Sequence, residues 1–257
     1  MDRKTDPVGI FDSGIGGISA LRAMMRLLPR ETFIYYGDTQ NAPYGTKEPQ
    51  EVISCVRAVV NELLRRRIKA LVIACNTATG AAAATLRREL DIPVIGMEPA
   101  LKPASELRKD GKILVLATPL TLHTEKFDRL MEKYGEGAEK VPCSGLMELV
   151  EHEDMAGSEQ YLRRLFAEYD MSQVDAIVLG CTHYVFLKDM IRDMIPPRVA
   201  ITEGSDGTAR QLKRVLQRNG LLNETGEGRV ILETSGTEKD LRLMRKLLGE
   251  SEKQGET

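Results

Sequence analysis

Two segments of the sequence place a cysteine in the same local setting. The segment "LVIACNTATG" (residues 71–80) has Cys75 between an apolar run and a cluster of small polar residues, and "IVLGCTHY" (residues 177–184) repeats the arrangement with Cys181. A thiolate is a nucleophile and a metal ligand, so a cysteine at the end of a buried strand can do chemistry. A single cysteine there is more often a small buried hydrophobe. The repetition of this cysteine setting in both halves of the chain favours a functional role over a purely structural one.

A metal site and a nucleotide loop are the alternative interpretations of these polar motifs. Cys181 and His183 could bind a metal, but the sequence has only three histidines and no C-x-x-C or H-x-x-x-H spacing. The stretch "GIGG" (residues 14–17) lacks the third spaced glycine and the Lys-Ser/Thr of nucleotide loops, and Asp12 before it would repel a phosphate. The glycines therefore predict a tight turn, and we expect no metal.

The cysteine segments lie within a regular alternation of strand and helix patterns. Short apolar runs predict buried strands at residues 7–12, 32–36, 70–74, 92–96, 112–117, 175–179 and 199–202. Helical periodicity lies at residues 17–28, 50–67, 79–90, 121–134, 157–169, 184–194, 206–218 and 238–248. This alternation is typical of parallel sheets built from βαβ units, and the chain length favours two sheets over one. The chain would cross between them near 96–104 and return near 201–209.

Composition and charge limit the classes of protein that the chain can form. With 257 residues and a net charge of −2, the chain can bury a full core and has no extended basic tract for nucleic acid. No apolar run approaches the roughly 20 residues that span a bilayer, and the first residues do not resemble a signal peptide. We therefore expect a cytoplasmic protein without membrane contact. Its thiols are then expected to stay reduced, which applies to Cys55, Cys75, Cys143 and Cys181.

The polar residues that follow three predicted strands should lie close together. These residues are Asp12-Ser13, Cys75-Asn76-Thr77 and Cys181-Thr182-His183. Ligands of open α/β sheets collect beyond the carboxyl ends of the strands, and the first amides of a following helix can hold a carboxylate or phosphate. The sequence therefore predicts a pocket for a compact, charged molecule. A helix N-terminus can also raise the thiolate fraction of a neighbouring cysteine.

Six stretches together resemble the bacterial glutamate racemases, which belong to the cofactor-independent aspartate/glutamate racemase superfamily. They are "GIFDSGIGGISAL", "YYGDTQNAPYG", "ACNTATGAAAATL", "IPVIGMEPALKPA", "VLGCTHYVFL" and "EGSDGTARQL", and the resemblance runs from about residue 7 to about 217, with an echo in "LETSG" near 232. The resemblance implies two similar α/β domains, with mainly parallel sheets, that face each other across an active-site cleft. We expect residues 1–97 plus 208–257 to form the first domain, with Asp12 and Cys75. Residues 98–207 would form the second, with Glu151, Cys181 and His183.

The same resemblance implies interconversion of L- and D-glutamate by proton transfer at Cα. Inverting a stereocentre without a cofactor requires an acid and a base on opposite faces of one carbon, which would explain the two cysteines. The resemblance places Cys75 on the D-glutamate face and Cys181 on the L-glutamate face. It makes Asp12 the assistant of Cys75 and His183 the assistant of Cys181. Glu151 is placed near the second thiol, in a stretch that also contains Glu148, His152 and Glu153.

Substrate contacts, cellular role and assembly are further implications of the resemblance. The resemblance implies a homodimer that supplies D-glutamate for peptidoglycan, and hence for the cell wall and cell shape. One departure from the family is Glu98 in "GMEPA", where many members carry an aliphatic residue. The implied substrate-binding residues are Asp12, Ser13, Tyr44, Gly45, Asn76, Thr77, Thr118, Thr182 and His183, with Thr121 ranked behind Thr118.

Three other functions stay open from the sequence. A racemase of the same superfamily that acts on aspartate or another amino acid would keep both thiols. A non-catalytic amino-acid-binding protein would need the pocket but neither thiol. A thiol redox protein would form a disulfide, which two thiols separated by a substrate should not form. Substrate panels and Cα-proton exchange separate these functions.

Overall fold

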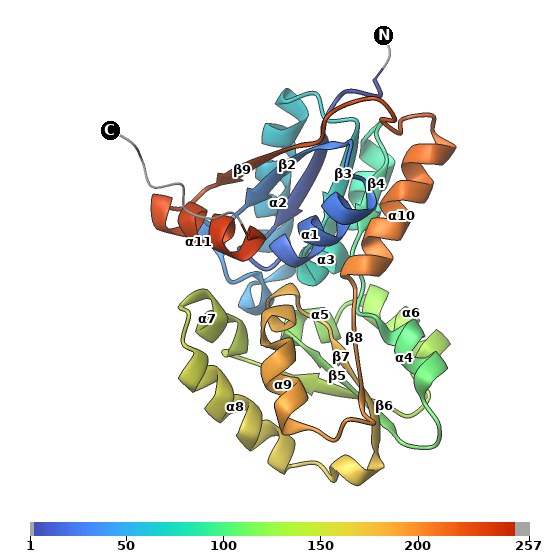
Figure 1. The fold of residues 1–257 in the computed structure, drawn as a ribbon, viewed down its shortest axis with the longest axis vertical. Helices are drawn as coiled ribbons and strands as arrows, with labels where there is room; N and C mark the ends of the chain where they lie inside the picture. The colour runs from blue at the N-terminus through green and yellow to red at the C-terminus, as the bar shows by residue number, and fades with distance from the viewer. Residues whose placement is uncertain (1–2, 250–257) are drawn as a thin grey trace.

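The protein has two α/β lobes, each built on its own parallel sheet, in a computed structural model that describes residues 3–249 (Figure 1). The five-stranded sheet of the first lobe has the order β4-β3-β1-β2-β9, and the four-stranded sheet of the second has the order β6-β5-β7-β8. Every neighbouring pair is parallel. The strands are β1 (Val8–Asp12), β2 (Thr32–Gly37), β3 (Ala70–Ile73), β4 (Val94–Gly96), β5 (Lys112–Ala117), β6 (Ala138–Pro142), β7 (Val174–Leu179), β8 (Ala200–Glu203) and β9 (Arg229–Thr234).

Helices cover both faces of the first sheet because its central strands are apolar on both sides. Successive residues of β1 point to opposite faces, so Ile10 packs under one helix layer and Phe11 under the other. One layer consists of α1 (Ile18–Leu27), α10 (Ser205–Arg218) and α11 (Glu238–Leu248). The other consists of α2 (Pro49–Arg65) and α3 (Asn76–Glu89).

The second sheet is covered in the same way. Leu114 and Leu116 face one layer, and Ile113 and Val115 face the other. The first layer holds α7 (Leu146–Glu151), α8 (Met155–Ala167) and α9 (Lys188–Met194). The second holds α4 (Leu101–Leu107), α5 (Pro119–Leu122) and α6 (Glu125–Tyr134). Short 3-10 turns are η1 (Thr39–Asn41), η2 (Tyr44–Thr46), η3 (Met171–Gln173) and η4 (Thr182–Leu187).

The seven predicted strands and the two-sheet α/β class are confirmed. The strands β6 and β9 were not predicted, because both lie at a sheet edge and their sequences, "AEKVP" and "RVILET", are too polar for a buried run. Helices α4 and α7 were also not predicted. The expected boundary between residues 207 and 208 falls inside α10, which packs against α1 of the first lobe. The domain limits themselves stay a prediction.

The C-terminal part of the described chain returns to the first lobe, where β9 pairs with β2 (Figure 1). A buried ion pair lies on the same side of this lobe. Lys69 Nζ lies 2.5 Å from Glu31 Oε2, both side chains are at most 1% exposed, and Glu31 Oε1 accepts a hydrogen bond from the Asn223 amide. Within residues 3–249, no helix is long and apolar enough to cross a membrane.

We expect Glu31→Gln to lower the free energy of unfolding by about 3–5 kcal/mol, because it leaves the Lys69 charge buried opposite a neutral amide. The matched control is Glu89→Gln, which breaks the half-exposed surface pair of Glu89 with Arg57. That change should cost about 0–1 kcal/mol. Urea denaturation of the three proteins measures both losses, and equal losses would contradict the prediction.

Candidate active site

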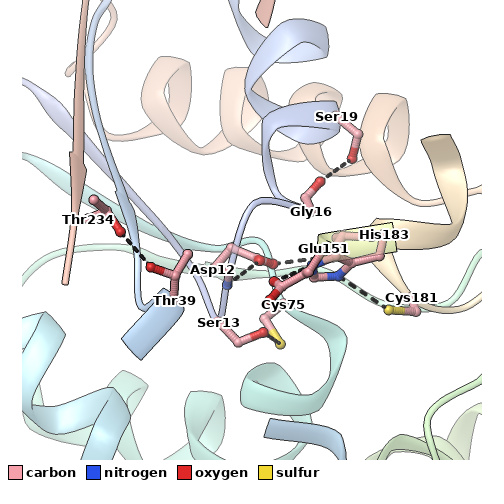
Figure 2. A network of polar contacts seen from close by, with 12 residues as sticks. Asp12, Ser13, Gly16, Ser19, Thr39, Cys75, Glu151, Cys181, His183 and Thr234 are labelled. Carbon is pink, nitrogen blue, oxygen red and sulfur yellow. Dashed lines mark hydrogen bonds and ion pairs between the residues drawn. The ribbon is translucent and has the colours of Figure 1, made fainter. Parts of the chain in front are cut away.

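The carboxyl ends of the two sheets meet at a small cavity with walls from both lobes. Cys75 follows β3 and Cys181 follows β7, and the two thiols are only 6% and 7% exposed. Figure 2 shows Cys75 with Ser13 and Asp12 from the first lobe, and Cys181 with His183 and Glu151 from the second. The cavity is lined by Ser13, Gly45, Cys75, Asn76, Thr77, Thr118, Met147, Gly180, Cys181, Thr182 and His183.

Cys75 caps the N-terminus of α3. Its Sγ accepts a hydrogen bond from the Ala78 amide at 3.4 Å and lies 3.4 Å from Ser13 Oγ. Burial raises the pKa of Cys75 to about 12, the charge of Asp12 adds to this rise, and the contacts with Ser13 and Ala78 only partly offset it. The helix terminus therefore acts in the expected direction, but burial outweighs it. The buried surroundings of Cys75 therefore favour the protonated thiol.

Cys181 is connected to a buried imidazole and a carboxylate. Its Sγ lies 3.7 Å from His183 Nδ1, and His183 Nε2 lies 2.8 Å from Glu151 Oε1 (Figure 2). Burial acts to lower the pKa of His183, but the hydrogen bonds and charges of Cys181 and Glu151 outweigh it, and the pKa stands well above its usual value. The Glu151 carboxylate thus favours a proton on His183, beside Cys181.

The structure separates Glu151 from the acidic residues near it in the chain. Glu151 contacts His183, whereas Glu153 forms an ion pair with Lys246 of α11. The position of Glu151 at the C-terminal end of a short helix could not be predicted from the spacing of charges in "MELVEHE". Whether Glu151 serves catalysis stays a prediction.

Asp12, at the end of β1, connects the two lobes. Its Oδ1 accepts a hydrogen bond from the Gly14 amide at 2.8 Å, and its Oδ2 accepts one from the Thr182 hydroxyl of the second lobe at 3.2 Å. Burial raises the pKa of Asp12, and the charge of His183 partly offsets the rise. Asp12 acts on Cys75 through its charge.

Gly14 and Gly16 of "GIGG" are required by close contact between the lobes. None of them is among the glycines with a left-handed backbone. A Cβ at Gly14 would lie 2.0 Å from Glu151 Oε1, and one at Gly16 would lie 2.4 Å from Thr182 Oγ1. The predicted turn is present, but Gly14 and Gly16 are explained by the approach of the second lobe, which the sequence did not reveal.

The predicted substrate-binding residues fall into two groups. Those on the cavity wall are Ser13, Gly45, Asn76, Thr77, Thr118, Thr182 and His183. Asp12 lies behind this wall, and Tyr44 turns its hydroxyl away to Asp38 at 2.6 Å. Met147 and Gly180 also line the cavity and were missed. A methionine on an apolar helix face carries no signal of a site, whereas the glycine directly before Cys181 was a signal that went unused.

Three threonine hydroxyls form a triangle across the lobes. Thr77 Oγ1 lies 3.0 Å from Thr118 Oγ1 and 2.9 Å from Thr121 Oγ1. Thr118 Oγ1 and Thr121 Oγ1 are 2.9 Å apart. Thr121 therefore supports the cavity wall formed by Thr77 and Thr118. Hydroxyls that can turn their protons offer donors to an anion without carrying charge themselves.

Asn76 supplies an unsatisfied acceptor at the cavity. Among residues 3–249, its Oδ1 is the buried side-chain oxygen or nitrogen atom without a hydrogen-bond partner. A buried polar atom without a partner is costly, and an unoccupied ligand contact is a common reason for one. An N–H donor of a bound molecule would satisfy it. Within the described residues, no group of three or more His, Cys, Asp and Glu side chains could hold a metal ion.

Two parallel-sheet lobes that bring one thiol each to a shared cavity define a class of acid–base enzyme that can address both faces of one carbon. The chain belongs to the Asp/Glu/Hydantoin racemase family, whose model matches residues 16–212. Glutamate racemase of Clostridium botulinum (strain Kyoto / Type A2) is 47% identical over 246 residues, which cover 94% of this chain and 96% of that protein.

Solved structures show the same similarity. Glutamate racemase from Thermus thermophilus, in complex with β-chloro-D-alanine, has a TM-score of 0.83 and 36% identity, covering 96% of this chain and 94% of that one. Glutamate racemase from Francisella tularensis, in complex with D-glutamate, has a TM-score of 0.82 and 27% identity, covering 98% and 96%.

Proposed function

We propose that this protein is a glutamate racemase that exchanges the Cα proton of L- and D-glutamate between two thiols. The observation that carries the proposal is the presence of Cys75 and Cys181, one from each lobe, on the wall of one cavity. The membership of the racemase family and the 47% identity to a glutamate racemase support it. An amino-acid-binding protein would need no such pair of thiols.

The reaction requires one thiol in each protonation state. The thiolate removes the Cα proton and becomes a thiol, the resulting carbanion is delocalised into the α-carboxylate, and the opposite thiol delivers its proton to the other face and becomes a thiolate. The reverse reaction starts from this exchanged state, and a second turnover in the same direction requires the two thiols to regain their first protonation states. We assign Cys75 to D-glutamate and Cys181 to L-glutamate, with Asp12 assisting the first and His183, oriented by Glu151, assisting the second.

The cavity wall has the groups that an amino acid with two carboxylates needs. The free Oδ1 of Asn76 can accept a hydrogen bond from the substrate ammonium. The hydroxyls of Ser13, Thr77, Thr118 and Thr182 can donate to its carboxylates. No lysine or arginine is among the described residues that line the cavity, so neutral donors and His183 must hold both carboxylates. Burial excludes water, which would otherwise compete for these bonds and for the carbanion.

The pure protein is expected to interconvert L- and D-glutamate without pyridoxal phosphate, and to keep its rate with EDTA or a carbonyl reagent present. Circular dichroism of either enantiomer, followed until the signal vanishes, measures this. A rate lost on chelation and restored by one metal would contradict the cofactor-independent mechanism. Aspartate and other amino acids in the same assay test the alternative of a different substrate.

We also propose that the enzyme is cytoplasmic, supplies D-glutamate for peptidoglycan, and acts as a homodimer. These proposals rest on the similarity to glutamate racemases. Light scattering at micromolar concentration is expected to give about twice the 28.6 kDa mass of the chain. A mass of one chain only would contradict the dimer.

A further inference from the structure

The turn that contains Tyr44 and Gly45 forms part of the cavity wall without directing the Tyr44 side chain into it. Gly45 lines the cavity, and a Cβ at this position would lie 2.6 Å from the Cβ of Thr118 in the second lobe. Tyr44 is 1% exposed and packs beside the Phe11 ring, with ring centroids 6.2 Å apart. The position of this turn therefore decides the shape of the cavity at Gly45.

Asp38 is the polar centre that holds this turn. Its carboxylate, 2% exposed, accepts hydrogen bonds from the Tyr44 hydroxyl at 2.6 Å, the Ser235 hydroxyl at 2.7 Å and the Asn41 amide at 3.0 and 3.2 Å. Its own amide donates to the Asp12 carbonyl at 3.0 Å. Asp38 thus contacts the end of β1 through its backbone amide, and its buried carboxylate ties this point to the Tyr44 turn and to the segment after β9.

The end of β9 and the residue after it contact η1, which directly precedes the Tyr44 turn. Thr39 Oγ1 lies 2.8 Å from Thr234 Oγ1 (Figure 2), and the Gln40 amide donates to Ser235 Oγ at 3.1 Å. Bonds to a charged acceptor are shorter and about twice as strong as neutral ones, and the 2.6 Å bond from Tyr44 fits this class. Burial and the hydrogen bond to Asp38 raise the pKa of Tyr44, so its hydroxyl keeps the proton it donates.

We propose that Asp38 is a positioning residue that, through the Tyr44 hydroxyl, holds the Tyr44–Gly45 turn as a wall of the substrate cavity and thereby sets the affinity for glutamate. The proposal rests on the glutamate racemase function proposed above. Because Asp38 does not line the cavity or contact a thiol, it acts on substrate binding in the ground state and transition state alike. Loss of such uniform binding raises KM and leaves kcat nearly unchanged.

The test compares Asp38→Asn and Tyr44→Phe with the wild type. An asparagine offers one acceptor oxygen and turns an N–H toward a neighbouring donor, and a phenylalanine removes the donated proton. Each change should raise the KM for both enantiomers about 10-fold, with kcat within about 3-fold of wild type. Both changes break the same hydrogen bond, so the KM of the double variant should be little higher than that of either single variant. Such non-additive effects are expected in a double-mutant cycle of two residues in contact. Ser235→Ala should raise KM less.

Glu233→Gln is the matched control, because Glu233 borders the same surface groove as Asp38 but pairs with Arg66. A wild-type KM in Asp38→Asn or Tyr44→Phe would overturn the proposal. So would an equal rise in Glu233→Gln, additive effects in the double variant, or a fall in kcat at constant KM. Thermal melts check that each variant is folded. If Asp38→Asn does not fold, Ser235→Ala tests the same hydrogen-bond network with the buried carboxylate still in place. Calorimetric titration with L-glutamate gives Kd directly, so it tests Asp38 even if the wild type proves not to racemise glutamate.

Discussion

Racemisation of glutamate is expected to fall about 10²–10⁴-fold in Cys75→Ser and in Cys181→Ser, the usual contribution of a positioned acid or base. A serine hydroxyl has a far higher pKa than a thiol, so it cannot serve as the base at neutral pH. Because the enantiomers are equal in free energy, kcat/KM must be the same in both directions for every variant. Racemisation alone therefore cannot show which thiol serves which face.

Elimination from a β-chloro amino acid reports proton abstraction from one face only. The base removes the Cα proton, the C–Cl bond breaks, chloride leaves, and no proton is needed on the opposite face. With β-chloro-D-alanine, the molecule bound in the Thermus thermophilus structure, Cys181→Ser should release chloride faster than Cys75→Ser. With β-chloro-L-alanine the order should be reversed. Chloride or pyruvate formation measures both rates.

Cys55→Ser is the matched control, because Cys55 is a partly buried thiol of α2 away from the cavity lining. It should racemise at the wild-type rate. Equal loss of elimination from both enantiomers in both variants would show that the assignment of faces is wrong. A near wild-type racemisation rate in either variant would refute the two-thiol mechanism.

The second large effect is expected for Glu151→Gln, and it should depend on both face and pH. In the wild type, the charges and hydrogen bonds of Glu151 and Cys181 hold the pKa of His183 well above its usual value against the effect of burial. Without the Glu151 carboxylate, the burial penalty on the imidazolium remains and its pKa falls. His183 then loses its proton at lower pH. Elimination from the L enantiomer should fall about 10²-fold at alkaline pH.

In the pH profile measured with the L enantiomer (the L-side profile), the alkaline limb should move to lower pH, whereas the profile measured with the D enantiomer (the D-side profile) should keep its shape. Glu148→Gln, on the same helix, is the control and should leave both profiles in place. A shift in the D-side profile alone, or none in either, would contradict the proposed pairing of Glu151 with the Cys181 side. Measurement of chloride release from pH 6 to 10 with each enantiomer distinguishes these outcomes.

The sequence by itself determined the fold class and the centre of the site. Apolar runs that alternate with helical periodicity can only be buried as parallel strands under helices on both faces, and the strand ends then meet at one edge. Cys75-Asn76-Thr77 and Cys181-Thr182-His183 stand directly after such strands, so their place at the cavity follows from local position alone. The edge strand β9 escaped prediction because its apolar run, residues 230–232, is short, lies beside charged residues and is not fully buried.

Only the tertiary structure decided how these residues act. The pKa of Cys75 is raised because burial outweighs the helix terminus, and burial is a property of both lobes together. Contact with His183 inside the second lobe distinguishes Glu151 from its acidic neighbours, and the close approach at Gly16 is a contact across the lobes. The Tyr44 hydroxyl meets Asp38 and not the cavity, a choice of rotamer that the turn sequence does not encode. Desolvation, charge and contact depend on distances between residues remote in the chain, and local sequence patterns contain no such distances.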